Sequence, residues 1–184
     1  MVPRIRRDDC VIVIIDVQEK FLPVLDRKDV LASNIKKLAM ASGEFGIPLI
    51  VTEQYPKGLG KTIDDIYMIL GEHDYIEKST FSCFKDEVFK ETLARKGKRQ
   101  IIICGIEAQV CVNQTALDAL DAGYEVFVAG DAIDSRKSLD RELAIERMRQ
   151  AGVVIEATES ILFYMLDSHE DGKFKNLQWI VKSF

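Results

Sequence analysis

Three residues of this chain, Asp16, Lys78 and Cys111, have side chains that could cooperate in nucleophilic catalysis. A cysteine attacks carbonyl groups as a thiolate, and at its ordinary pKa near 8.5 the thiol is mostly protonated at neutral pH. An ammonium group such as that of Lys78 would stabilise the thiolate. A carboxylate such as that of Asp16 could accept the thiol proton and later protonate a leaving amine. Taken singly, the three also fit a strand-end turn, a surface charge and a small core residue.

The four cysteines of the chain are not equivalent. Cys111 falls in the first turn of a predicted helix, where free backbone N–H groups favour an anion and could hold an oxyanion. Cys104 lies inside a predicted strand with no charged residue beside it, and Cys83, although close to Lys78, is predicted to be a packed thiol. The cysteines form no CxxC pair, which favours reduced thiols in a cytoplasmic protein.

Short β-branched runs alternate with longer amphipathic segments along the chain. This rhythm predicts one α/β domain spanning residues 1–184, with a parallel sheet and helices on both faces. The expected strands are 10–16, 49–54, 74–78, 99–105, 124–131 and 153–158. The expected helices are 29–45, 86–96, 110–122, 139–152, 159–166 and 173–183, and residues 55–65 are expected to form an irregular polar loop.

The carboxyl ends of parallel strands meet at one edge of the sheet, where ligands bind in open α/β folds. Asp16, Lys78 and Cys111 all follow strands, so the sequence predicts that they meet at this edge. The candidate walls of a substrate pocket come from the same edge and are Gln18, Phe21, Tyr55 and Phe81.

Composition and motifs exclude several functions. The net charge is −5 and no basic stripe is present, which argues against nucleic acid as a partner. No apolar stretch approaches the roughly 20 residues of a membrane span, and the apolar run after the basic N-terminus is too short for a signal peptide. The GLGKT segment (58–62) has Tyr55 where a phosphate-binding loop needs glycine, and neither a G-x-G-x-x-G nor a G-x-S-x-G motif occurs.

Four segments in order resemble the isochorismatase-like cysteine hydrolases, a superfamily that includes nicotinamidases. They are IIDVQ (14–18), EKSTFSCF (77–84), GIEAQVCV (105–112) and GDAIDSR (130–136). The segment VTEQYPKGLGKT (51–62) resembles the isochorismatase domain-containing branch.

The resemblance implies a three-layer α/β/α sandwich with a six-stranded parallel sheet and a catalytic triad of Asp16, Lys78 and Cys111. It also implies a cis peptide between Ile106 and Glu107, an oxyanion hole formed by the backbone N–H groups of Glu107 and Cys111, and a homo-oligomer. Asp131, Ser135 and Arg136 match a segment of the same family, and we expect them to support the site residues or stabilise a turn, with contact to the substrate as the alternative.

The chain departs from the nicotinamidases where they carry an Asp-x-His…His metal site. Its only histidines are His73 and His169, so we expect no metal and no cofactor. A cysteine nucleophile favours hydrolysis of a small amide or carbamoyl compound. Two alternatives remain open: an isochorismatase-type ether hydrolase that uses Asp16 and Lys78, and a non-catalytic α/β binding module. A flavodoxin-like cofactor binder is disfavoured because the phosphate loop is missing.

Overall fold

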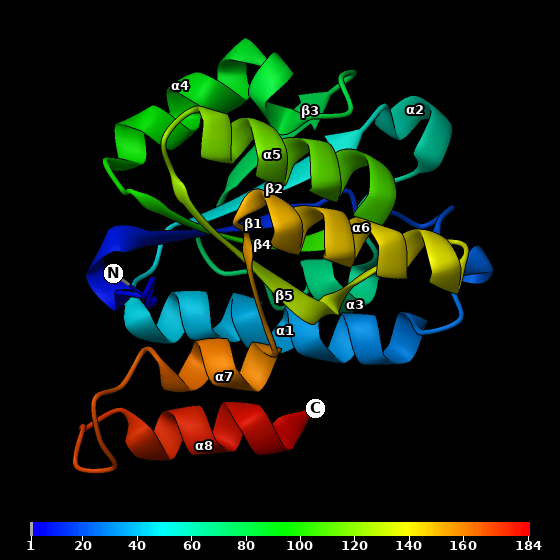
Figure 1. Ribbon diagram of the computed structural model, residues 1–184. Coiled ribbons are helices and arrows are strands. Elements are labelled where there is room, and N and C mark those ends of the chain that lie inside the picture. Colours follow the sequence, from blue (N-terminus) through cyan, green and yellow to red (C-terminus); the bar gives the residue numbers. More distant parts are fainter. Residues whose placement is uncertain (1) are drawn as a thin grey trace.

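Six parallel strands form the central sheet of the computed structural model, which describes residues 2–184 (Figure 1). Their order across the sheet is β3-β2-β1-β4-β5-β6. The strands are β1 (Cys10–Ile15), β2 (Leu49–Gln54), β3 (Asp74–Lys78), β4 (Gln100–Ile106), β5 (Glu125–Asp134) and β6 (Val154–Glu156). The predicted parallel sheet is confirmed.

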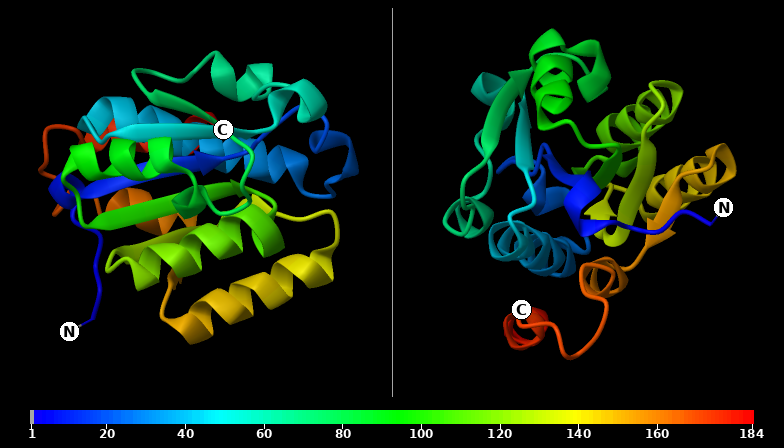
Figure 2. Two further views of the ribbon diagram at one scale, coloured as in Figure 1. Left: turned by 90° about the horizontal axis from the view of Figure 1, so that it is seen from above. Right: turned by 90° about the vertical axis from the view of Figure 1, so that its left-hand side faces the viewer.

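Helices cover both faces of the sheet, as predicted (Figures 1 and 2). One face carries α1 (Lys28–Phe45), α3 (Asp64–Tyr67) and α7 (Thr158–Phe163), and α8 (Phe174–Ser183) lies outside α1 and α7. The other face carries α4 (Glu87–Lys96), α5 (Asn113–Asp121) and α6 (Ser138–Ala151). None of the helices within residues 2–184 combines the length and the apolar character that crossing a membrane requires.

The two central strands are buried on both faces because each face is covered by helices. Every residue of β1 and of β4 is buried. Alternate side chains of β1 point to opposite sides of the sheet, so Ile12 and Ile14 join the core under α1, whereas Val11 and Val13 join the core under α5. This explains why these strands are near-continuous apolar runs in the sequence.

The structure corrects several of the predicted elements, including the bounds of β6 and α7, which end two and three residues earlier than predicted. Residues 55–65 are not irregular throughout, because they contain the short helix α2 (Pro56–Leu59) and the start of α3. Strand β5 continues to Asp134, three residues beyond its predicted end. Cys111 does not lie in the first turn of α5, because residues Ala108–Val112 form a separate turn of π-helix ahead of it.

Gly105 allows the central strands to approach each other closely at the carboxyl edge. It pairs with Ile15 of β1, and its φ of +127° is one that residues with side chains rarely adopt. A Cβ atom at this position would lie 2.0 Å from the Ile15 carbonyl oxygen. The pairing of β4 with β5 also shifts register between Ile103 and Gly105. Only glycine therefore fits where β4 leads into the turn that carries Cys111.

Replacing Gly105 by alanine should lower the free energy of unfolding by at least about 3 kcal/mol, because the methyl group meets backbone that cannot move aside. Gly43→Ala is the matched control, since Gly43 lies in α1 and a Cβ there would meet nothing within 4 Å. That variant should gain up to about 1 kcal/mol from helix propensity. Urea unfolding measures both changes, and a Gly105→Ala protein as stable as the parent would contradict the close approach.

Candidate active site

Asp16 lies directly after β1 in a backbone conformation that is uncommon for a residue with a side chain. Its φ is +53°, and such left-handed residues concentrate at functional sites. The side chain is fully buried, and its Oδ1 accepts a hydrogen bond of 2.7 Å from the Thr52 hydroxyl. The backbone N–H of Asp16 donates to the Thr52 carbonyl oxygen at 3.1 Å. Strand β2 therefore holds this carboxylate from the side.

Lys78 ends β3 and reaches across β2 to Asp16. Its Nζ lies 2.6 Å from Asp16 Oδ2, and both side chains have no exposed surface. The ammonium group also donates to Gln54 Oε1 at 2.8 Å, and the carbonyl oxygens of Thr80 and Phe81 lie 3.1 and 3.2 Å from it. A buried ammonium group is tolerated only when its protons find acceptors. Here the acceptors also hold the group in one place.

Charge pairing decides the ionisation of Lys78. Burial is the largest single influence and lowers its pKa, but the charge of Asp16 opposes it, and with the remaining influences the net shift is upward from the ordinary value. The thiols of Cys83 and Cys111 also favour the charged ammonium. Lys78 is therefore a permanent cation at neutral pH, next to two of the four thiols.

Cys111 is held in the cysteine turn, which we define as residues 107–112. The Glu107 carbonyl oxygen accepts hydrogen bonds from the N–H groups of Val110 and Val112, both at 3.1 Å. The peptide bond between Ile106 and Glu107 is cis. Cys111 is 6% exposed, in contrast to the other three cysteines, each of which is fully buried.

The neighbouring Lys78 cation could be expected to keep Cys111 deprotonated. The surroundings of Cys111 have the opposite net effect. The pKa of Cys111 is raised from its ordinary value, first by burial and then by the negative charge of Asp16. Lys78 acts in the opposite direction but does not prevail. The thiol is therefore protonated at rest, within the electrostatic influence of both charges.

The other three cysteines, Cys10, Cys83 and Cys104, are buried inside the protein. The Cys104 thiol faces the Val13 carbonyl oxygen at 3.7 Å inside the sheet, and burial raises its pKa. Burial likewise raises the pKa of Cys83 to about 12, although Lys78 opposes that shift. Burial also raises the pKa of Cys10 to about 12. The prediction that Cys83 and Cys104 are packed thiols is confirmed.

The predicted pocket residues take different positions. Gln18 is fully buried, and its side chain is held by the loop after β2: its Nε2 donates to the carbonyl oxygens of Gln54 and Gly60, and its Oε1 accepts from the Gln54 N–H. Phe21 is partly buried against the core under α1. The rings of Tyr55 and Phe81 are more than half exposed. Because the Phe81 carbonyl oxygen contacts Lys78, that segment borders the site.

Sequence reasoning missed the roles of Thr52 and Gln54, which extend from β2 to Asp16 and Lys78. It named Glu107 only for its backbone N–H, and missed that the Glu107 side chain binds Arg136 at 2.5 Å. A threonine and a glutamine near the end of an apolar strand were the available signal for the first two. Asp131 lies within β5, and its Oδ1 accepts from the N–H and the hydroxyl of Thr158, so it links β5 to the start of α7.

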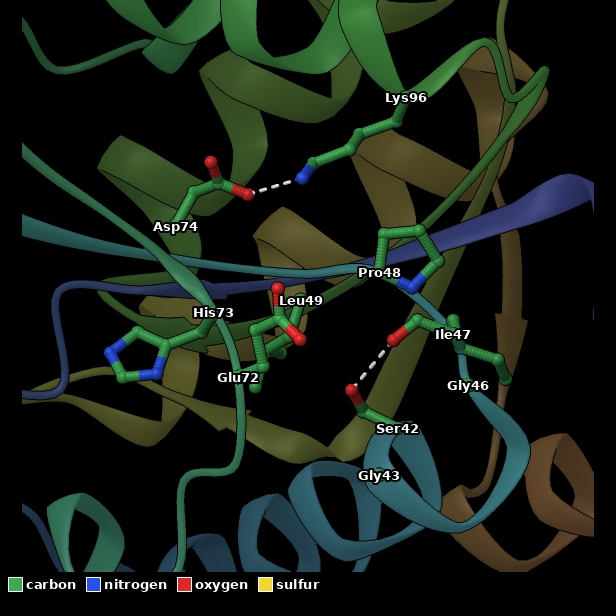
Figure 3. Close-up of a pocket in the computed structure, with 10 residues that line it drawn as sticks. All are labelled: Ser42, Gly43, Gly46, Ile47, Pro48, Leu49, Glu72, His73, Asp74 and Lys96. Atoms are coloured by element: carbon green, nitrogen blue, oxygen red, sulfur yellow. Dashed lines mark hydrogen bonds and ion pairs between the residues drawn. The ribbon is translucent and has the colours of Figure 1, made fainter.

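A cavity of about 390 Å³ lies at the opposite edge of the sheet, where β2 and β3 begin (Figure 3). Its lining includes Glu72 and the ion pair between Lys96 and Asp74, whose charged atoms lie 2.5 Å apart. This cavity shares no residue with the cluster of Asp16, Lys78 and Cys111. Within residues 2–184, no three His, Cys, Asp or Glu side chains are grouped so that they could hold a metal ion.

Lys78→Met should lower the free energy of unfolding by about 3–5 kcal/mol, because it leaves Asp16 as a buried charge without its cation. Lys36→Met is the matched control: the Lys36 ammonium lies 2.8 Å from Asp65, whose side chain is 74% exposed. Such surface pairs contribute at most about 1 kcal/mol. Urea unfolding followed by circular dichroism measures both variants, and equal losses would contradict a special role for the buried pair.

Comparison with known proteins identifies the family of this chain. The model of the isochorismatase domain matches residues 10–160. The chain is 38% identical over 173 residues to isochorismatase domain-containing protein 2 of Xenopus laevis, an alignment that covers 93% of this chain and 82% of that protein. It is 36% identical to isochorismatase domain-containing protein 1 of Salmo salar, with 91% of this chain covered, but it spans only 59% of that longer protein.

Solved structures agree with the sequence comparison. A structure described as the MAR1 ribonuclease of Caenorhabditis elegans superposes with a TM-score of 0.92 and 34% identity, covering 97% of this chain and 92% of that one. The YcaC gene product of Escherichia coli, described as an octameric hydrolase of unknown specificity, has the same fold at 23% identity, with a TM-score of 0.87 and 100% and 99% of the two chains covered. The expected kinship is confirmed: the chain belongs to the isochorismatase domain family.

Proposed function

We propose that this protein is a cysteine-dependent hydrolase that cleaves the C–N bond of a small amide or carbamoyl compound. The observation that carries the proposal is the buried ion pair between Lys78 and Asp16, whose two charges both act on the Cys111 thiol. Such a pair is costly to bury, and a buried pair beside a thiol whose pKa is perturbed is typical of a catalytic site. Membership of the isochorismatase domain family supports hydrolysis as the reaction class.

In the proposed reaction, Asp16 acts as the general base. It accepts the thiol proton of Cys111 as the sulfur attacks the substrate carbonyl carbon, so the raised pKa of the thiol is overcome at the moment of attack. Lys78 balances the negative charge as it moves from the carboxylate to the sulfur. The backbone N–H groups of Glu107 and Cys111 stabilise the oxyanion of the tetrahedral intermediate.

The second half of the reaction returns the enzyme to its starting state. Protonated Asp16 gives its proton to the leaving nitrogen, the C–N bond breaks, and a thioester to Cys111 remains. Asp16 then deprotonates a water molecule that attacks the thioester. The acid leaves, and the thiol of Cys111 recovers its proton. One water is consumed for each amide cleaved, and every proton moves between groups of this chain and its substrate, so the scheme needs no cofactor.

The aromatic side chains near this edge favour a small, partly apolar substrate. Tyr55 follows β2, and its N–H donates to the Lys78 carbonyl oxygen at 3.0 Å. The Phe81 ring is exposed beside the same lysine. We propose these two rings as walls of the substrate pocket, with Phe21 behind them.

A homo-oligomer and a cytoplasmic location are also proposed. The octameric description of the YcaC structure and the 59% exposure of Trp179 on α8 support an interface between copies, since Trp179 is not a core residue.

The ribonuclease description of the Caenorhabditis elegans structure suggests RNA as a different substrate. The net charge of −5 of this chain does not favour a polyanion, so RNA serves as a comparison arm in the activity test.

Ammonia release from a panel of small primary amides and carbamoyl compounds tests the proposed function. We expect turnover of at least one member, and a loss of at least about a thousandfold in Cys111→Ala, because the nucleophile is removed. Cys10→Ala is the matched thiol control and should retain turnover, since Cys10 begins β1 at the far edge. Turnover of a vinyl ether that survives in Cys111→Ala would support ether chemistry by Asp16 and Lys78 instead. Cleavage of RNA alone would contradict the proposal, and no turnover in any arm would favour a binding module.

Alkylation of Cys111 by iodoacetamide should keep rising with pH beyond about pH 9, because the thiol pKa is raised. Asp16→Asn removes the charge that helps to raise this pKa while Lys78 still lowers it. The alkylation curve of this variant should therefore move to lower pH, although its turnover falls at least about a hundredfold for lack of the base. Mass spectrometry of the intact protein measures the rates. A curve that stays in place or moves to higher pH in Asp16→Asn would contradict the assignment of Asp16.

A further inference from the structure

Four polar side chains connect the end of β5 to the cysteine turn. The Arg136 guanidinium binds the Glu107 carboxylate through Nε at 2.5 Å and through Nη2 at 3.2 Å. Gln109 Nε2 donates to Glu107 Oε2 at 2.7 Å, and the Ser135 hydroxyl donates to Gln109 Oε1 at 2.6 Å. None of these contacts takes part in the chemistry proposed for Asp16, Lys78 and Cys111.

Burial makes this network more than a surface ion pair. The Glu107 side chain is only 5% exposed, whereas that of Arg136 is 60% exposed. A buried carboxylate requires hydrogen-bond donors, and Glu107 receives three of them, two from Arg136 and one from Gln109. The pKa of Arg136 is raised by its hydrogen bond to Glu107. A two-pronged contact of this kind restricts orientation as well as distance.

The network acts on the part of the backbone where an oxyanion would bind. Glu107 is the residue whose carbonyl oxygen organises the cysteine turn, through Val110 and Val112. Its N–H is one of the two proposed oxyanion donors. A shift of the Glu107 side chain would therefore move both the donor and the turn that carries Cys111.

The other end of the network is anchored in the sheet. The Ile133 carbonyl oxygen accepts a hydrogen bond from Arg141 Nε at 3.1 Å, and Asp134 Oδ2 accepts from the Arg27 N–H at 3.3 Å. Ser135 and Arg136 follow directly, so they extend from a fixed strand end. The guanidinium is already neutralised by Glu107, which disfavours a role as receptor for a substrate anion.

We infer that Arg136 is a positioning residue: through Glu107 it holds the oxyanion donors of the cysteine turn, and it does not set the reactivity of the thiol. This inference rests on the proposed cysteine mechanism. It separates two properties of Cys111. Formation of a thioester needs the oxyanion donors, whereas alkylation by iodoacetamide creates no oxyanion and needs only the thiolate.

The experiment compares these two reactions on the same sulfur. Acetylation of Cys111 by p-nitrophenyl acetate and alkylation by iodoacetamide are followed by mass spectrometry in the parent, in Arg136→Ala and in Arg136→Lys. Arg99→Ala is the matched control, because Arg99 forms an exposed ion pair with Asp9 at the opposite edge of the sheet.

Arg136→Ala should slow acetylation about 10–100-fold while alkylation changes less than about threefold. Arg136→Lys should recover part of the acetylation rate, and added ethylguanidinium should restore part of it in Arg136→Ala. Arg99→Ala should match the parent in both reactions.

Other outcomes overturn the inference. Unchanged acetylation in Arg136→Ala removes the positioning role, and equal loss of both reactions assigns Arg136 to the integrity of the fold. If Arg136→Ala raised the KM of anionic substrates alone, Arg136 would be a residue that binds the substrate. If the parent protein itself forms no acetyl-Cys111, both the cysteine mechanism and this inference fail. If the parent and Arg136→Ala are acetylated at the same rate, only the inference fails.

Discussion

The buried contact between Lys78 and Asp16 is the interaction on which the rest of the site depends. Two opposite charges lie 2.6 Å apart with no exposed side-chain surface. Removing such charges from water costs several kcal/mol for each ion, and this cost is offset only when geometry and hydrogen bonds are nearly complete. Strand β2 completes them, because Thr52 donates to the carboxylate and Gln54 accepts from the ammonium. The interior of this edge is therefore built around the pair.

The pair also explains why one thiol among four is suited to chemistry. Burial raises the pKa of all four cysteines, so burial does not distinguish them. The charge of Lys78 also acts on the pKa of Cys83, but Cys83 is fully buried. Cys111 alone combines the electrostatic influence of Asp16 and Lys78 with an exposed fraction of 6%. A protonated thiol beside a carboxylate can lose its proton as it attacks, which a thiol in an apolar strand cannot do.

The strands and the edge at which polar residues gather were predictable from the sequence because both follow from periodicity and from parallel topology. Asp16, Lys78 and Cys111 could be nominated for the same reason. The π-turn around Cys111 and the left-handed backbone of Asp16 were not predictable, since tertiary contacts impose them. Glu107 and Arg136 are 29 residues apart, and no local pattern indicates that β5 extends far enough for them to meet. The hydrogen bonds of Gln18 to Gln54 and Gly60 were not predictable either, because an amide after a strand fits a pocket wall as well as it fits a loop contact.

The order of the strands places Cys111 between two groups of supporting residues. The first strand, β1, lies in the middle of the sheet, with β2 and β3 on one side of it and β4, β5 and β6 on the other. Ligands in open sheets bind where the order reverses in this way. Asp16, Thr52, Gln54 and Lys78 come from the first half, and the cysteine turn with its link to Arg136 comes from the second. In the proposed mechanism, one half therefore supplies the groups that move the proton of the thiol, and the other supplies the backbone around it. Gly105 lets the two halves meet, because only a residue without a side chain fits against Ile15.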